Sequence, residues 1–201
     1  VMLRLSSHED IIEFSKHSSK PVINALSDES HPCQILADLM TYQEMNGSIK
    51  NKKITWIGDG CNVCQTYMQA AGIFDFKLSI ATPKGYEPSE LFIESYKKNI
   101  NFYSDPLMAC ENADIIVTDV WTSMGQESEK KQRELAFTGF QVDQNMMNQA
   151  KKDAIFMHCL PAYREKEVSS EVIDGNQSVV WSEAENRLHV QKSLLLYLIE
   201  N

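Results

Sequence analysis

The sequence predicts an α/β protein, a wound parallel sheet with helices on both faces, together with the tail of a second α/β domain. Two observations support this fold class. Short, nearly continuous apolar runs alternate with helical patterns almost to the end of the chain, which is typical of strands buried on both faces of a parallel sheet. The 201 residues are 43% apolar and 23% charged, a composition that can bury a core.

The expected elements follow one another without an internal repeat or a low-complexity segment. Strands are expected at residues 1–5, 22–26, 53–58, 78–82, 114–119, 154–158 and 178–181. Helices are expected at residues 9–17, 33–45, 62–71, 89–99, 127–137, 144–151, 165–174 and 183–200. In the second helix, Ile35, Leu36, Leu39 and Met40 recur at helical spacing.

Composition argues against several classes of partner. Acidic residues (28) outnumber Lys and Arg (19), giving a net charge of −9, so we expect no nucleic-acid partner. The longest apolar run, residues 194–199, is far shorter than the roughly 20 residues of a membrane span. Five cysteines without a secreted disulfide spacing favour a reducing compartment, the cytoplasm. The sequence begins at Val1 inside an expected strand, so we expect the natural start to lie upstream.

Polar residues gather directly after the expected strands. In a parallel sheet, ligands bind at the carboxyl ends of the strands. The segments at those ends carry more polar groups than structural loops need: residues 24–34, 59–62, 82–85, 119–125 and 158–164. We therefore expect the functional site along this edge of the sheet.

Two motifs after the strand at 53–58 also have structural explanations. Residues 58–60 read Gly-Asp-Gly, but the third glycine of a dinucleotide-binding pattern would fall at Val63 and no acidic residue ends the next strand; a tight turn explains the glycines equally well. Cys61 and Cys64 form a C-x-x-C pair at a helix start, where the dipole favours a thiolate. Zinc would need a second pair, so a redox dithiol and a chance pair are the alternatives.

Residues 31–34 read His-Pro-Cys-Gln, with the proline in the first helical turn, where its missing N–H costs nothing. His31 and Gln34 then face the same way at the positive end of the helix dipole, which suits an anion or a polarised carbonyl oxygen. A capping box, in which Gln34 reaches back to the helix start, is the structural alternative. These residues alone favour neither interpretation.

Three further motifs carry candidate chemistry. Residues 119–125 read Asp-Val-Trp-Thr-Ser-Met-Gly; Asp119 at a strand end can fix an ammonium group, and Ser-Met-Gly is flexible enough to close over a ligand. Residues 158–161 read His-Cys-Leu-Pro, where a thiol beside an imidazole suggests a nucleophile. Arg187 near the start of the last helix could reach an oxyanion, although an Arg on a terminal helix is more often a solvated surface residue.

Together these motifs resemble the ornithine carbamoyltransferases of the aspartate/ornithine carbamoyltransferase superfamily. His-Pro-x-Gln, Gly-Asp-Gly-x-Asn, Asp-Val-Trp-x-Ser-Met-Gly, His-Cys-Leu-Pro and Glu-Asn-Arg occur in the order that the family shows. Residues 22–28 and 81–88 add weaker matches. The resemblance extends over essentially all 201 residues, and five motifs in register are far more specific than any single one.

The resemblance implies carbamoyl phosphate and L-ornithine as ligands. The residues it assigns to carbamoyl phosphate are Arg4, His31, Gln34, Cys159, Leu160 and Arg187. The residues it assigns to ornithine are Asn62, Asp119, Ser123 and Met124. His31, Cys159 and Arg187 are the expected catalytic residues. Cys61 departs from the family pattern, because it stands where the first of two Asn residues is usual.

The implied reaction moves the carbamoyl group to the side-chain amine of ornithine and gives L-citrulline and phosphate. His31 and Arg187 would stabilise the oxyanion that the attacked carbonyl becomes. We expect Cys159 to position the amine rather than to form a covalent intermediate, because the adjacent His158 points to the opposite face of a regular strand and cannot serve as its base. The resemblance implies no metal ion or cofactor, and a homotrimer.

The family's phosphate-binding Ser-Thr-Arg-Thr segment is not in these residues. Residues 1–45 contain too few strands for an independent core and are expected to be the C-terminal remnant of the carbamoyl-phosphate domain. Residues 46–183 are the expected ornithine domain, and residues 184–201 a helix that packs back on the first domain. The 201 residues are expected to be inactive alone. The alternatives are a carbamoyltransferase for another acceptor, such as putrescine or a modified ornithine, a non-catalytic ligand-binding fragment, and a nucleotide-binding module.

Overall fold

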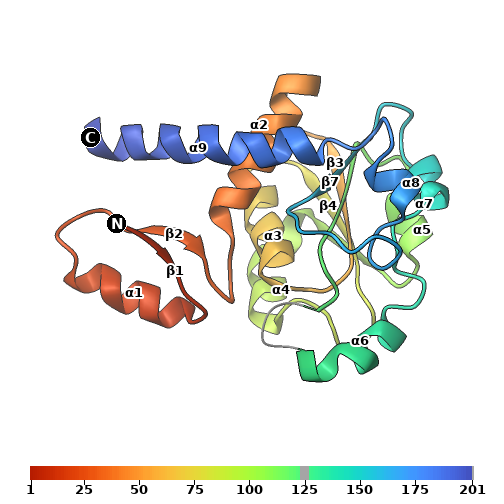
Figure 1. Cartoon of the computed structure of the whole chain (residues 1–201), viewed down its shortest axis with the longest axis horizontal. Coiled ribbons are helices and arrows are strands. Elements are labelled where there is room, and N and C mark those ends of the chain that lie inside the picture. Colours follow the sequence, from red (N-terminus) through yellow and green to blue (C-terminus); the bar gives the residue numbers. More distant parts are fainter. Residues whose placement is uncertain (123–126, 201) are drawn as a thin grey trace.

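The main body of the chain is a five-stranded parallel sheet (Figure 1). The computed structural model describes residues 1–122 and 127–200. The strands are β3 (Lys53–Ile57), β4 (Lys77–Ala81), β5 (Ile100–Tyr103), β6 (Ile115–Thr118) and β7 (Ile155–His158). Their order is β5-β4-β3-β6-β7, and every neighbouring pair is parallel. The predicted α/β fold class with a wound parallel sheet is confirmed.

Helices cover both faces of this sheet and enclose two separate apolar cores. Successive strand side chains point to opposite faces, so Trp56 belongs to one core and Ile57 to the other. The Trp56 core includes residues of α2 (Pro32–Asn46), α3 (Asn62–Phe74) and α4 (Glu90–Tyr96). The Ile57 core includes residues of α5 (Pro106–Cys110), α7 (Gln144–Gln149) and α8 (Ser170–Ile173). The near-continuous apolar strands therefore have the two-sided burial that their sequence predicts.

The first part of the chain forms a small unit of its own. β1 (Met2–Arg4) pairs in parallel with β2 (Ile23–Leu26), and α1 (His8–His17) connects them. α1 begins at Ser7, whose hydroxyl accepts the Asp10 backbone N–H, an N-cap of the usual kind. In Figure 1 this unit, in red, lies to the left of the five-stranded sheet, and α2 leads from it to that sheet.

The last helix, α9 (Val180–Glu200), packs against α2 and extends beyond it (Figure 1). Leu195, Tyr197 and Ile199 in its second half are exposed. Among the described residues, no helix is both long enough and apolar enough to cross a bilayer.

Several element predictions were wrong in detail. Residues 178–181 are not a strand: Ser178 makes one bridge to Phe156 and α9 begins at Val180, because a short apolar run does not distinguish a strand from a buried helix start. The predicted boundary at residue 184 therefore falls inside α9. Strand β5 and helix α5 were not predicted. The long helix expected at 165–174 is reduced to α8, and the one at 127–137 is split into a 3₁₀ turn (Glu127–Glu129) and α6 (Lys130–Ala136).

The order of the strands determines where a ligand crevice lies. From β3 the chain first builds outward through β4 and β5, then returns to the other side of β3 for β6 and β7. The connections leave β3 and β6 in opposite directions, and such a switch point opens a crevice at the carboxyl ends of the strands. Gly58 and Asp119 directly follow these two strands, so the predicted site segments meet at this point.

Candidate functional site

A cavity of about 900 Å³ lies at the carboxyl ends of β3, β6 and β7, facing β1 and the loop before α2. Its wall includes most of the residues predicted to bind the two ligands: Arg4, His31, Asn62, Asp119, Cys159, Leu160 and Arg187. Gln34 is not in the wall. Ser123 and Met124, the other two predicted ornithine contacts, lie outside the described residues.

His31 is the N-cap residue of α2, and its imidazole is almost fully buried at 5% exposure. Its backbone N–H donates to Thr66 Oγ1 at 2.8 Å, and its Nδ1 has no hydrogen-bond partner within the described structure. Burial, then the nearby charges of Arg187 and Arg4, lower the pKa of His31 to about 4. The imidazole is therefore neutral at pH 7, and its unpartnered Nδ1 is buried within the described structure.

Gln34 does not form the capping box that was the structural alternative. Its Nε2 donates to Asp38 Oδ1 at 2.9 Å and to Glu183 Oε1 at 2.7 Å, and its Oε1 accepts from Arg187. The side chain is 1% exposed, so in this conformation it holds Arg187 from behind the cavity. Direct contact of Gln34 with the carbamoyl group stays a prediction, and the contacts described here do not favour it.

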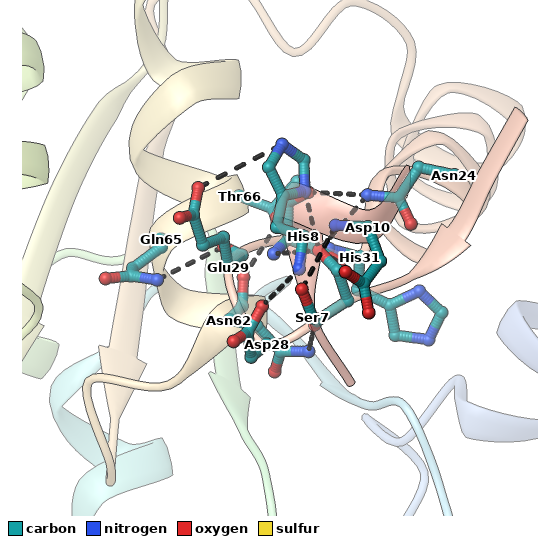
Figure 2. A network of polar contacts seen from close by, with 12 residues as sticks. Ser7, His8, Asp10, Asn24, Asp28, Glu29, His31, Asn62, Gln65 and Thr66 are labelled. Atoms are coloured by element: carbon teal, nitrogen blue, oxygen red, sulfur yellow. Dashed lines mark hydrogen bonds and ion pairs between the residues drawn. The ribbon is translucent and has the colours of Figure 1, made fainter. Parts of the chain in front are cut away.

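Asn62 connects the start of α3 to the loop before α2. Its Nδ2 donates to the Ser27 carbonyl at 2.6 Å and its Oδ1 accepts the Val63 N–H at 2.9 Å. Gln65 adds a bond to the Glu29 carbonyl at 3.1 Å. Figure 2 shows Asn62, Gln65 and Thr66 facing the loop that carries Asp28, Glu29 and His31. Asn62 therefore joins the first unit of the chain to the main sheet and retains one N–H for a ligand.

Asp119 stands between two thiols. Its Oδ1 accepts from the Val120 N–H at 2.7 Å and from Cys159 Sγ at 3.2 Å, and Cys61 Sγ lies 4.0 Å from Oδ2. Burial raises the pKa of Asp119. Burial, followed by the Asp119 charge, raises the pKa of Cys159 and of Cys61 well above the usual thiol value. Both sulfurs are therefore protonated donors, and Asp119 is the acidic group that lines the cavity between them.

His158 does not activate Cys159. Its Nδ1 accepts the Leu160 N–H at 2.9 Å, and its Nε2 lies 3.3 Å from Glu167 Oε1 on the other side of the sheet. The ring is completely buried. Leu160 has a φ of 55°, a left-handed conformation that is uncommon for a bulky residue and is found at functional sites. The His-Cys-Leu-Pro segment thus presents a neutral thiol and a shaped backbone to the cavity.

One group of side chains has the composition of a metal site. Asp119, His158 and Cys159 each place a possible ligand atom within 4.8 Å of the others. Both imidazole nitrogens already have partners, and the raised thiol pKa works against the thiolate that a metal requires. These contacts do not support a resident metal ion.

Backbone geometry favours the structural explanation of the glycines at 58–60. A Cβ on Gly60 would lie 2.2 Å from the backbone nitrogen of Pro88, so the close approach of that loop requires a glycine. Burial raises the pKa of Cys64 as well as that of Cys61, which does not favour a redox dithiol at the C-x-x-C pair. The helix dipole favours the thiolate less than burial disfavours it.

Sequence reasoning missed a buried ion pair in the cavity wall. Arg133 of α6 contacts Asp59 after β3, and its Nε donates to the Trp121 carbonyl at 2.5 Å. The Arg133 guanidinium also lies over the Tyr86 ring, 4.7 Å from its centroid. Burial raises the pKa of Asp59 to about 6, and Arg133 opposes this shift. The pair ties the loop after β6 to the end of β3; a lone Arg in a polar helix gave no signal of it.

The neutral His31 has a measurable consequence for stability. Its pKa of about 4 in the folded protein is below the unfolded value of about 6.5, so the unfolded chain binds more protons between these pH values. Wild type should therefore lose up to about 3 kcal/mol more unfolding free energy than His31→Asn as pH falls from about 7 to 4. Urea unfolding of both proteins across this range measures the difference, and parallel pH profiles would contradict the buried, neutral imidazole.

Comparisons with known proteins agree with this geometry. Residues 50–198 match the family model described as the Asp/Orn binding domain of aspartate/ornithine carbamoyltransferase, and residues 1–44 match its carbamoyl-P binding domain. The chain is 62% identical over 199 residues to an ornithine carbamoyltransferase of Ruthia magnifica and 53% identical to that of Hydrogenovibrio crunogenus, covering 99% of this chain and 67% and 66% of theirs.

A solved structure gives the same result. The crystal structure of ornithine carbamoyltransferase from Burkholderia thailandensis superposes with a TM-score of 0.91 at 46% identity, covering 98% of this chain and 64% of that one. The chain thus spans about two thirds of the length of the relatives it matches. It belongs to the aspartate/ornithine carbamoyltransferase family.

Proposed function

We propose that the protein containing this chain transfers the carbamoyl group of carbamoyl phosphate to the side-chain amine of L-ornithine, giving L-citrulline and phosphate. The observation that carries the proposal is the cavity that joins Asp119 and Cys159 with His31 and Arg187. It places an anion suited to an ammonium group beside a cation and a neutral imidazole suited to a carbonyl. The high identity to ornithine carbamoyltransferases supports the same substrates.

The proposed reaction requires charged side chains in two parts of the cavity. Asp119 and Asn62 hold the amino-acid end of ornithine, while Arg187 and His31 contact the carbamoyl oxygen. The uncharged side-chain amine attacks the carbamoyl carbon and the new C–N bond forms. The C–O bond to phosphate then breaks, and the proton that the amine nitrogen loses leaves with the phosphate as hydrogen phosphate. Arg187 stabilises the negative charge on the tetrahedral oxygen. Holding both substrates in line supplies much of the remaining acceleration.

Cys159 serves in this mechanism as a positioning group. Its pKa is raised and its thiol donates to Asp119, so the sulfur is a poor nucleophile. Cys159→Ser should therefore lower kcat, by up to about a hundredfold if the amine is misplaced, while carbamoyl phosphate binding changes little. Steady-state kinetics of the complete protein measure this, with the buried Cys110→Ser outside the cavity as a control. A carbamoylated Cys159 trapped by mass spectrometry during turnover would contradict the role.

The acceptor is tested by direct competition. Citrulline formation by the complete protein supports the proposal; preferential carbamoylation of putrescine or of a modified ornithine would replace it with the alternative acceptor. If both ligands bind but no product forms, the non-catalytic ligand-binding alternative holds instead. We further propose that the complete protein is a homotrimer and that it lies in the cytoplasm. The five cysteines, all free in the structure, agree with a reducing compartment.

The 201 residues alone are proposed to form no citrulline, because the phosphate-binding Ser-Thr-Arg-Thr segment is not among them. A phosphate dianion bound without its helix N-terminus and arginines loses most of its interactions. The assay is run on the chain alone and again with a separately expressed N-terminal segment. Robust turnover by the 201 residues would show that the site lies elsewhere.

A further inference from the structure

Two buried carboxyl groups lie directly behind the cavity wall and have no part in the reaction just described. Asp38 of α2 is 2% exposed and Glu183 of α9 is 1% exposed. Isolated buried charges are costly, so groups of this kind are retained where they have partners and a task. Asp38 and Glu183 meet at Gln34, although Gln34 and Glu183 are 149 residues apart in the sequence.

Every oxygen of the two carboxyl groups accepts a hydrogen bond. Gln34 Nε2 donates to one oxygen of each, at 2.9 and 2.7 Å. The Tyr67 hydroxyl donates to Asp38 Oδ2 at 2.6 Å, and the His158 backbone N–H donates to Glu183 Oε2 at 2.9 Å. The pair therefore connects α2, α3, the end of β7 and the start of α9.

This arrangement fixes which way the Gln34 amide points. Both hydrogens of Nε2 are taken by carboxyl oxygens, so Oε1 must face the other way, where it accepts from Arg187 Nη1. A flipped amide would set Oε1 against two acceptors. Gln191 completes the cradle when its amide oxygen faces Arg187, accepting from Nε at 3.1 Å and Nη2 at 3.0 Å.

The guanidinium is thus oriented by two uncharged amide oxygens. A carboxylate in direct contact with Arg187 would cancel part of the charge that the carbamoyl oxygen is proposed to meet. With Gln34 as a spacer, the carboxyl groups fix the geometry and the cation keeps its charge toward the cavity. Arg187 itself is half-buried and lines that cavity.

We propose that Asp38 and Glu183 act as positioning residues that lock the Gln34 amide and thereby aim Arg187 at the carbamoyl group of the substrate. The aim at a carbamoyl group rests on the proposed function; the locking of Arg187 does not. Burial raises the pKa of Asp38 to about 6 and that of Glu183 well above its usual range.

The kinetic test uses Asp38→Asn in the complete protein. The new amide allows Gln34 to flip, so the KM for carbamoyl phosphate should rise about tenfold, while the KM for ornithine changes less than twofold. Tyr67→Phe, which removes one bond to Asp38, should raise the same KM two- to threefold. Asp114→Asn is the matched control: this carboxyl is also buried and accepts the Lys53 N–H at 2.9 Å, but lies at the other end of the sheet, and should lower the Tm without changing either KM.

A crystal structure of Asp38→Asn separates this inference from the proposed function. The expected result is a Gln34 amide that no longer bonds Arg187, whether or not the protein forms citrulline. An unmoved Arg187–Gln34 contact, or KM losses no greater than those of Asp114→Asn, would overturn the inference. If Asp38→Asn does not fold, the test rests on Tyr67→Phe, and an unchanged KM for carbamoyl phosphate in that variant would overturn the inference. Absence of citrulline from the wild type would overturn only the proposed function.

Discussion

Asp119→Asn is expected to weaken ornithine binding about ten- to a hundredfold while leaving the fold intact. The wild-type carboxylate directly follows β6 and lines the cavity. Loss of a charge-assisted hydrogen bond to an ammonium group costs about 1.5–3 kcal/mol. The remaining oxygen of Asn can still accept the Val120 N–H, so little stability should be lost.

Calorimetric titration of ornithine into the complete protein, in the presence of phosphate, measures this change, and a thermal melt reports on the fold. Asp174→Asn is the control, because Asp174 is an exposed carboxylate paired with Arg164 at 2.7 Å and does not line the cavity. Unchanged ornithine affinity in a folded Asp119→Asn protein would remove Asp119 from the site.

Arg187→Gln is expected to lower kcat/KM for carbamoyl phosphate by about 10²–10³, the cost of removing one donor to a developing oxyanion. The shorter neutral side chain removes the cation from the cavity and leaves the Gln34 carbonyl without its donor. The effect on kcat should be large, because the interaction strengthens as charge develops on the carbonyl oxygen.

Arg164→Gln provides the matched control, since Arg164 is exposed and pairs with Asp174 but is not part of the cavity wall. Initial rates at varied carbamoyl phosphate give both kinetic constants. A threefold or smaller loss of kcat/KM in Arg187→Gln would mean that another group stabilises the oxyanion.

The main sheet could be predicted because several of its strands are continuous apolar runs. β3, β6 and β7 are buried along almost their whole length, and such runs have few other interpretations. β5 has no such signature: it lies at one edge of the sheet, Phe102 is 43% exposed and Asn101 is exposed as well. β7 lies at the other edge but is buried along its length, so the exposed side chains of β5 are what make its sequence less distinctive.

The wall of the site could be predicted for a topological reason. Because parallel strands end at the same edge, Asn62, Asp119 and Cys159 were expected together, and all three line the cavity. The groups behind the wall could not be predicted, because their roles depend on contacts between distant segments. Arg133 and Asp59 are 74 residues apart, and no local spacing brings the two together. Gln34 also shows the limit of motif reasoning, since its partners come from α9 as well as from its own helix.

The position of bound citrulline is the most direct test of the proposed substrate arrangement in the cavity. Crystals of the complete protein soaked in citrulline and phosphate hold the products in place of the reacting substrates. We expect the α-ammonium group at Asp119, the ureido oxygen within hydrogen-bond distance of Arg187 and His31, and the ureido nitrogen beside Cys159. Citrulline bound outside this cavity, or in the reverse orientation with its ureido group at Asp119, would rule out this arrangement.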